Sequence, residues 1–184
     1  KIFDKPGSED YNINKADISF NNVNFEYEIN ENKVLQDVNI EIEGGKMTAL
    51  VGHSGAGKST ILNLIPRFYD ISGGDIKVDG RSIYEIKLKS LRSNISLVSQ
   101  DVTLFDDTIK NNIIYGNSSA TEQEVSDAIN FSYCSDFIRN LPNKEDTIIG
   151  ENGVRLSGGE KQRISIARAM LKKSKIILLD EATS

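Results

Sequence analysis

Residues 52–60 read Gly-His-Ser-Gly-Ala-Gly-Lys-Ser-Thr, which fits the G-x-x-x-x-G-K-[ST] pattern of a phosphate-binding loop. Glycines let successive backbone N–H groups turn toward phosphate oxygens, because no Cβ obstructs the turn. Lys58 supplies a mobile positive charge for the β- and γ-phosphates, and Ser59 offers a hydroxyl to Mg²⁺. The predicted nucleotide contacts are Gly52, His53, Ser54, Gly55, Ala56, Gly57, Lys58, Ser59 and Thr60.

The flanks of this loop decide whether the pattern is more than a glycine-rich turn. Residues 47–51 form a short apolar run without alternation, which predicts a strand buried on both faces. Residues 61–68 carry apolar side chains at helical spacing, and Pro66 should kink or end that helix. A strand, the loop and a helix in this order are the context that the motif requires.

Asp180 and Glu181 follow the aliphatic run Ile176–Leu179, which predicts a buried strand. Carboxylates at the carboxyl end of such a strand lie where an open α/β sheet binds its ligand. Asp180 is therefore a candidate partner of Mg²⁺, either direct or through an intervening group. Glu181 is the candidate general base or orienting group for an attacking water. The alternative is a pair of solvated acids.

Residues 156–160 read Leu-Ser-Gly-Gly-Glu and precede a predicted helix over 157–171. Ser157 can cap the helix, and the two glycines expose backbone N–H groups at its positive end. A plain helix cap would need only the serine. The glycine pair therefore suggests an anion site, and in an ATPase that anion would be the γ-phosphate of a second ATP.

Elsewhere, alternating and helical patterns predict an α/β core with a helical insert. Asn21-Asn22 breaks the first alternating run as a bulge or turn, and Asp79-Gly80 marks a turn. Strands are expected over 18–27, 38–42, 76–78 and 95–98, and helical structure over 108–140.

Composition narrows the function class of this chain of 184 residues. The net charge of −5 argues against nucleic acid as the main partner. Cys134 has no partner for an internal disulfide and is interpreted as a packing residue. The chain begins with Lys1 rather than Met, so we expect it to belong to something longer, with polar residues 1–17 as a linker or extended arm.

The phosphate loop, L-S-G-G-E-K-Q-R at 156–163 and I-I-L-L-D-E-A-T-S at 176–184 together resemble the ATP-binding cassette family over about residues 18–184. The resemblance implies a P-loop NTPase (RecA-like) α/β core with an antiparallel β subdomain and a helical insert over about 101–160. It also implies that residues 1–17 link to a membrane domain and that the family's C-terminal segment is truncated at Ser184.

The resemblance also implies roles for single residues. Tyr27 matches the aromatic side chain that stacks on adenine, although aromatic residues are common on strand surfaces. Gln100 matches the glutamine that touches Mg²⁺ and the attacking water, although a solvated loop glutamine is the alternative. The implied metal ligands are Ser59, Gln100 and Asp180, the implied catalytic residues are Glu181 and Gln100, and the implied contacts to the second nucleotide are Leu156, Ser157, Gly158, Gly159 and Glu160.

Residues 101–116 and 149–153 resemble the exporter branch, where they face the intracellular loops of the membrane domain. The implied protein is a Mg²⁺-dependent ATPase that powers export or flipping of a lipid-like or hydrophobic substrate. It would act at the cytoplasmic face of a membrane, the bacterial inner membrane in particular. Its partners would be that transmembrane domain and a second cassette in a head-to-tail ATP-sandwich dimer, with no nucleic acid.

Two departures from the family pattern bear on activity. Glu160 stands where glutamine is commoner, but the backbone amides remain, so we expect the site to function. The family's switch histidine would lie beyond Ser184, because His53 is the only histidine and lies in the phosphate loop. We therefore expect this stretch by itself to bind Mg-ATP weakly and to hydrolyse little. The rival interpretations are an ATP-binding cassette ATPase of DNA repair or translation and a non-catalytic nucleotide-binding fragment.

Overall fold

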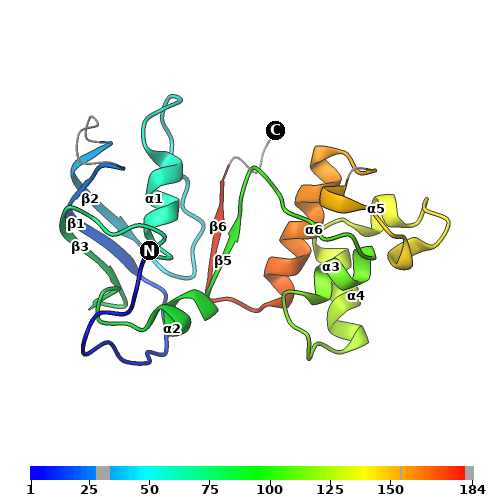
Figure 1. Cartoon of the computed structure of the whole chain (residues 1–184), viewed down its shortest axis with the longest axis horizontal. Coiled ribbons are helices and arrows are strands. Elements are labelled where there is room, and N and C mark those ends of the chain that lie inside the picture. Colours follow the sequence, from blue (N-terminus) through cyan, green and yellow to red (C-terminus); the bar gives the residue numbers. More distant parts are fainter. Residues whose placement is uncertain (28–33, 154, 181–184) are drawn as a thin grey trace. The chain divides into compact units, whose positions relative to one another are not determined.

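The computed structural model describes residues 1–27, 34–153 and 155–180, without the side chain of Asn152. The chain divides into two compact units, Lys1–Ile95 and Ser96–Ser184. Figure 1 shows the helices and strands of both units, most of them labelled.

The first unit is built on a four-stranded antiparallel sheet with the order β2-β1-β3-β4. The strands are β1 (Ile18–Phe25), β2 (Leu35–Ile42), β3 (Gly73–Val78) and β4 (Arg81–Ser82). The inward side chains of β1 are nearly inaccessible, and so is the side chain of Leu35 at the start of β2. The predicted antiparallel subdomain is thus present, and its alternating pattern places one face of the sheet in the core.

Both turn signals in this sheet are confirmed. The pairing of β1 with β2 shifts register between Phe20 and Val23, and Asn22 has a φ of 51° there. This is a β-bulge, and asparagine tolerates the left-handed conformation that it imposes. Asp79 and Gly80 likewise have φ values of 50° and 78°, which let the chain reverse between β3 and β4.

The helix after the phosphate loop, α1 (Lys58–Leu64), ends just before Pro66, as the sequence predicts. The predicted strand over 47–51 is wrong. These residues adopt no regular structure, and the side chains of Met47 and Val51 are 98% and 93% exposed. A strand needs a neighbour to receive its backbone hydrogen bonds, and the sheet of this unit pairs none of its strands with 47–51.

The N-terminal residues form an extended arm that packs within the first unit. Asp4 accepts a hydrogen bond from the backbone N–H of Leu88 at the start of α2 (Leu88–Ser93), at 2.6 Å. Glu9 forms a parallel bridge with Ile86, and Ile13 is almost fully buried. The arm is therefore part of the folded unit.

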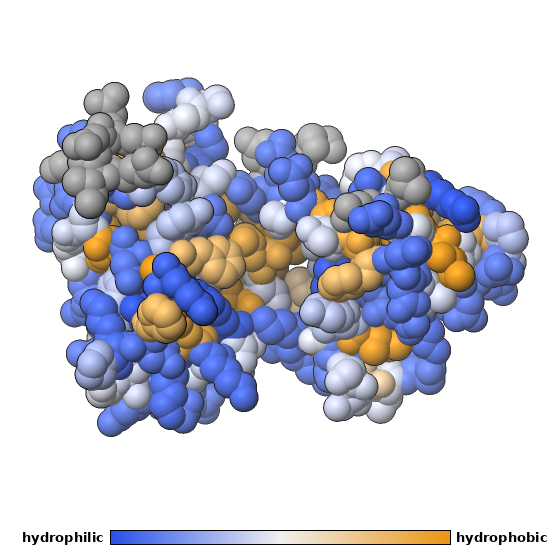
Figure 2. All heavy atoms as spheres, viewed as in Figure 1, coloured by the Kyte–Doolittle hydropathy of each residue, from blue (hydrophilic) through white to orange (hydrophobic). Residues whose placement is uncertain are grey.

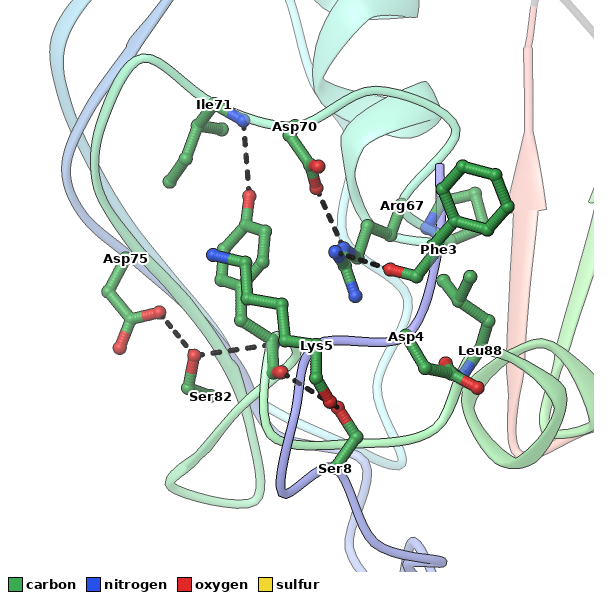
Figure 3. A network of polar contacts seen from close by, with 12 residues as sticks. Phe3, Asp4, Lys5, Ser8, Arg67, Asp70, Ile71, Asp75, Ser82 and Leu88 are labelled. Carbon is green, nitrogen blue, oxygen red and sulfur yellow. Dashed lines mark hydrogen bonds and ion pairs between the residues drawn. The ribbon is translucent and has the colours of Figure 1, made fainter. Parts of the chain in front are cut away.

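A buried arginine joins the arm to the segment after α1 (Figure 3). The Arg67 guanidinium is 1% exposed and donates to the carboxylate of Asp70 at 2.7 Å and to the carbonyl of Phe3 at 3.1 Å. It also lies over the ring of Tyr84, 4.8 Å from the centroid. Since a buried cation is tolerated only with such partners, this network fixes the turn around Arg67.

The second unit combines a small sheet with a helical cluster. Strands β5 (Ile95–Val98) and β6 (Ile176–Leu179) pair and run in the same direction. The helices are α3 (Ile109–Ile114), α4 (Glu122–Phe131), α5 (Ser135–Ile138) and α6 (Gly158–Leu171), with single turns η1 (Lys144–Asp146) and η2 (Glu151–Gly153). Both predicted strands and the predicted helical segments are confirmed.

The helices of this unit pack α3 and α4 against α6 around one apolar core. Cys134 belongs to that core and is inaccessible, and burial raises the pKa of its thiol to about 11. The interpretation of Cys134 as a packing residue is thus confirmed. Among the helices of the described ranges, none is both long enough and apolar enough to cross a membrane.

The arm is held most tightly at Asp79. Its carboxylate accepts hydrogen bonds from the backbone N–H groups of Asn14, Lys15 and Asp17, at 2.7, 3.1 and 2.9 Å. We expect Asp79→Asn to lower the free energy of unfolding by about 1–2 kcal/mol, because the amide keeps the side-chain shape but loses the charge and an acceptor. Urea unfolding measures this, with Asp106→Asn, at an exposed aspartate, as the control. Equal stabilities of the two variants would contradict the role of Asp79.

Candidate functional site

The phosphate loop is an exposed turn whose shape depends on two left-handed glycines. Residues 52–56 are exposed, and Gly55 and Gly57 have φ values of 80° and 85°. A Cβ on Gly57 would lie 2.8 Å from Cδ2 of Leu35, the first residue of β2. Gly57 is therefore required twice, once for its backbone conformation and once for its packing on the sheet.

The Lys58 side chain folds back over the loop. Its ammonium donates to the carbonyls of Gly52 and His53, at 2.9 Å each. An ammonium has three N–H donors, so these two bonds do not exhaust it. The arrangement places the cation among the backbone groups of the loop, which is where a phosphate group would need it.

The candidate base-stacking residue lies beside the phosphate loop. Tyr27 follows the end of β1 and is 42% exposed. Its hydroxyl shares a hydrogen bond of 2.9 Å with the hydroxyl of Thr60, which is 5% exposed in the first turn of α1. Ser59, next to Thr60, is exposed. The structure thus brings together the two parts of the predicted nucleotide site that belong to the first unit.

The remaining predicted ligands belong to the second unit. Gln100 lies on an exposed bend after β5, and Asp180 follows β6. The backbone N–H of Asp180 donates to the carbonyl of Val98 at 2.9 Å, so the two residues come from the same end of this sheet. Glu181 lies outside the described residues. The joint magnesium site of Ser59, Gln100 and Asp180 stays a prediction, because Ser59 belongs to the other unit.

The segment Leu156–Glu160 forms the start of α6. The Ser157 side chain accepts from the N–H of Glu160, and the Glu160 carboxylate accepts from the N–H and the hydroxyl of Ser157, at 2.7 and 2.8 Å. This capping box explains the glutamate, because its carboxylate turns back onto the cap. The predicted cap is confirmed.

The two glycines of this segment are not needed by the fold. A Cβ added to Gly158 or Gly159 would meet no atom of the described residues within 4 Å, and both residues are exposed. Leu156, in contrast, packs against the helical core. The glycines therefore leave the N-terminal turn of α6 open to a group from outside the chain.

Sequence reasoning missed an internal polar pair, Asn112 and Arg168. Asn112 is 1% exposed and exchanges hydrogen bonds with the backbone N–H and carbonyl of Phe105, at 2.9 and 3.1 Å. Arg168 donates to the carbonyls of Asn112 and Thr103, at 2.9 and 3.1 Å, and burial lowers its pKa. The two residues are 56 positions apart, so no local pattern could have identified them.

This pair fixes a surface loop on the predicted membrane-facing segment. Leu104 is buried in the core, but Phe105 is 42% exposed and Tyr115 is 69% exposed, with ring centroids 4.6 Å apart. Figure 2 shows that apolar residues reach the surface of this unit. Within the segment 101–116, Leu104 thus belongs to the core and Phe105 to the surface.

Comparison with known proteins gives one consistent result. The model of the ABC transporter family matches residues 35–184. A proposed multidrug export ATP-binding/permease protein of Staphylococcus aureus is 49% identical over 178 residues, which cover 97% of this chain and 31% of that protein. The ATP-dependent lipid A-core flippase of Legionella pneumophila is 52% identical over 170 residues, which cover 92% of this chain and 29% of the flippase.

Among solved structures, a bacterial Atm1-family ABC exporter with ATP bound matches with a TM-score of 0.93 and 44% identity. The match covers 98% of this chain and 31% of the exporter. The chain therefore spans about a third of the length of the proteins that it resembles.

The glycines of the site make a matched pair for a stability test. Gly57→Ala should lower the free energy of unfolding by about 2–4 kcal/mol, because the left-handed φ strains alanine and the Cβ collides with Leu35. Gly158→Ala should leave stability unchanged or slightly higher, since its Cβ meets open space and alanine favours a helix. Chemical unfolding of both variants checks this, and equal losses would show that the packing on Leu35 is unimportant.

Proposed function

The chain belongs to the ATP-binding cassette (ABC) transporter family, and on that premise we propose that it is the ATP-binding and ATP-hydrolysing motor of a membrane exporter. One observation carries the nucleotide part of the proposal. A phosphate-loop cation and an exposed aromatic ring lie at one place in the first unit, joined through Thr60. A nucleoside triphosphate would contact both, because its phosphates would bind the cation and its base would stack on the ring.

The proposed nucleotide contacts follow from this geometry. The backbone N–H groups of residues 52–58 and the Lys58 ammonium bind the β- and γ-phosphates. The exposed face of Tyr27 stacks on adenine, which requires only a flat π surface. The exposed loop imposes no entry barrier within the first unit, so the site accepts ligand from solvent.

Mg²⁺ fits the residues predicted to bind it, because a hydroxyl, an amide oxygen and a carboxylate are oxygen donors of the class that this ion prefers. Ser59, Gln100 and Asp180 would hold it, and it would neutralise charge that develops on the phosphates. Glu181 would accept a proton from the attacking water, and Gln100 would orient that water. The described residues contain no group of three or more His, Cys, Asp or Glu side chains that could hold a metal.

The open glycine pair supports a second nucleotide contact. We place the γ-phosphate of an ATP bound to a partner cassette at Ser157, Gly158 and Gly159, in a head-to-tail dimer. The Glu160 carboxylate accepts hydrogen bonds from the Ser157 N–H and hydroxyl, so it is turned back onto the cap. An incoming phosphate would then bind the exposed N–H groups of the two glycines.

The relatives indicate what the motor drives. These relatives are named for multidrug export and lipid A-core flipping, so we propose a lipid-like or hydrophobic substrate and a place at the cytoplasmic face of a membrane. The exposed Phe105 and Tyr115 would contact the membrane domain, since exposed aromatic residues favour interfaces. The DNA-repair or translation alternative is not favoured, because the relatives described above are exporters.

Lys58→Ala should weaken binding of Mg-ATP by about 10- to 100-fold, because a charge-assisted contact to phosphate contributes roughly 1.5–3 kcal/mol. Isothermal titration calorimetry of the chain measures this. Lys46→Ala is the control, since Lys46 pairs with Glu43 at the surface. If the Lys58 variant binds ATP as tightly as the control, the phosphate loop is not the nucleotide site.

Glu181→Gln should keep ATP binding and lower hydrolysis by about 10²- to 10⁴-fold, because the amide preserves the shape but cannot accept the proton. The assay needs the protein at the length of the exporters that it resembles. ATP-dependent dimers of this variant should persist, and adding Gly158→Val should abolish them without loss of stability. Hydrolysis at the parental rate would exclude Glu181 as the base.

A further inference from the structure

The Tyr27 side chain, which is proposed to stack on the base, belongs to a small cluster. Phe25, Tyr27 and Tyr69 contact one another, with ring centroids 4.8 Å apart for Phe25–Tyr27, 5.1 Å for Tyr27–Tyr69 and 5.8 Å for Phe25–Tyr69. The first two pairs are perpendicular, at 83° and 89°. Since neither neighbour lies parallel to Tyr27, no side chain of this cluster occupies its parallel-stacking position.

The exposure of the cluster is uneven. Phe25 is 2% exposed and anchors it in the core of the sheet, whereas Tyr27 and Tyr69 are 42% and 41% exposed. Here the two tyrosines form an open edge next to the phosphate loop, and the Tyr27 hydroxyl is fixed to Thr60 at 2.9 Å.

Tyr69 itself is held by its neighbours in the chain. It lies between Arg67 and Asp70, which form an ion pair at 2.7 Å, and Arg67 is 1% exposed and bound to the arm (Figure 3). The backbone of this turn is further bonded to α1, through Arg67 N–H to Leu64 and Phe68 N–H to Asn63. Tyr69 thus has a rigid base from which to restrain Tyr27.

We propose that Tyr69 and Thr60 are positioning residues for base recognition, which hold the Tyr27 ring in the orientation that stacks on the nucleotide base. Tyr69 restrains the ring laterally, and Thr60 fixes its hydroxyl to the first turn of α1. Holding the ring in advance removes the entropic cost of ordering it on binding. The proposal rests on the proposed ATP-binding function, adds Tyr69 to it and gives the Thr60 side chain a separate part in the preference for a ligand that carries a base.

The test compares ATP with inorganic tripolyphosphate, which lacks the base and the ribose, by calorimetry on the chain in the presence of Mg²⁺. Tyr69→Leu and Thr60→Val should each lower the ratio of ATP affinity to tripolyphosphate affinity by about three- to tenfold. Tyr69→Phe, which keeps the ring, and Thr60→Ser, which keeps the hydroxyl, should retain the affinity ratio of the parent. Tyr133→Leu, at an exposed tyrosine of the second unit, should leave it unchanged.

Thr60 is buried, so a change in the binding ratio of Thr60→Val could also come from misfolding. Tyr27→Phe removes the same hydrogen bond at its exposed end and tests it without changing a buried residue. Tyr27→Phe should lower the ratio as Thr60→Val does, and the double variant should lower it no further, because both remove one bond. Wild-type ratios in Tyr69→Leu and Tyr27→Phe, with ATP bound normally by the parent, would overturn this inference alone. A parent that binds neither ligand would overturn the proposed function, and this inference with it.

Discussion

The close approach of Gly57 to Leu35 is the constraint on which the nucleotide site depends. Only glycine combines a φ of 85° with an α-carbon so near to a buried leucine of β2. This contact seats the end of the phosphate loop directly on the antiparallel sheet. The first turn of α1 follows Gly57 directly, so the contact of Gly57 with the sheet also fixes the positions of Lys58, Ser59 and Thr60.

The same sheet positions the aromatic side of the site. Phe25 is the last residue of β1 and is buried, and Tyr27 follows it onto the surface. The hydrogen bond to Thr60 then joins the strand end to the helix start. A triphosphate and its base would therefore be recognised by two segments with a common support, which limits how far the two contacts can move apart.

The start of α6, in contrast, depends only on residues next to it in the sequence. Ser157 and Glu160 satisfy each other in a capping box, so the helix begins without help from the rest of the chain. Gly158 and Gly159 add nothing to this cap and meet no neighbour. Residues whose type the fold does not require are the ones that an outside partner can explain, and this is why the glycine pair supports a contact between cassettes.

The sequence by itself determined the positions of the strands in the first unit, the break at Asn21-Asn22, the end of α1 before Pro66 and the cap at Ser157, because each follows from local sequence patterns. It also identified the phosphate loop and the family, because those motifs are contiguous.

The sequence reasoning was wrong about residues 47–51, since a run of apolar residues cannot show whether a neighbouring strand is available to pair with it. Only the tertiary structure decided that Tyr69 touches Tyr27, that Arg168 supports Asn112 and that the arm binds Asp79. Those contacts join residues distant in sequence, and their energies depend on burial and geometry that no local pattern contains.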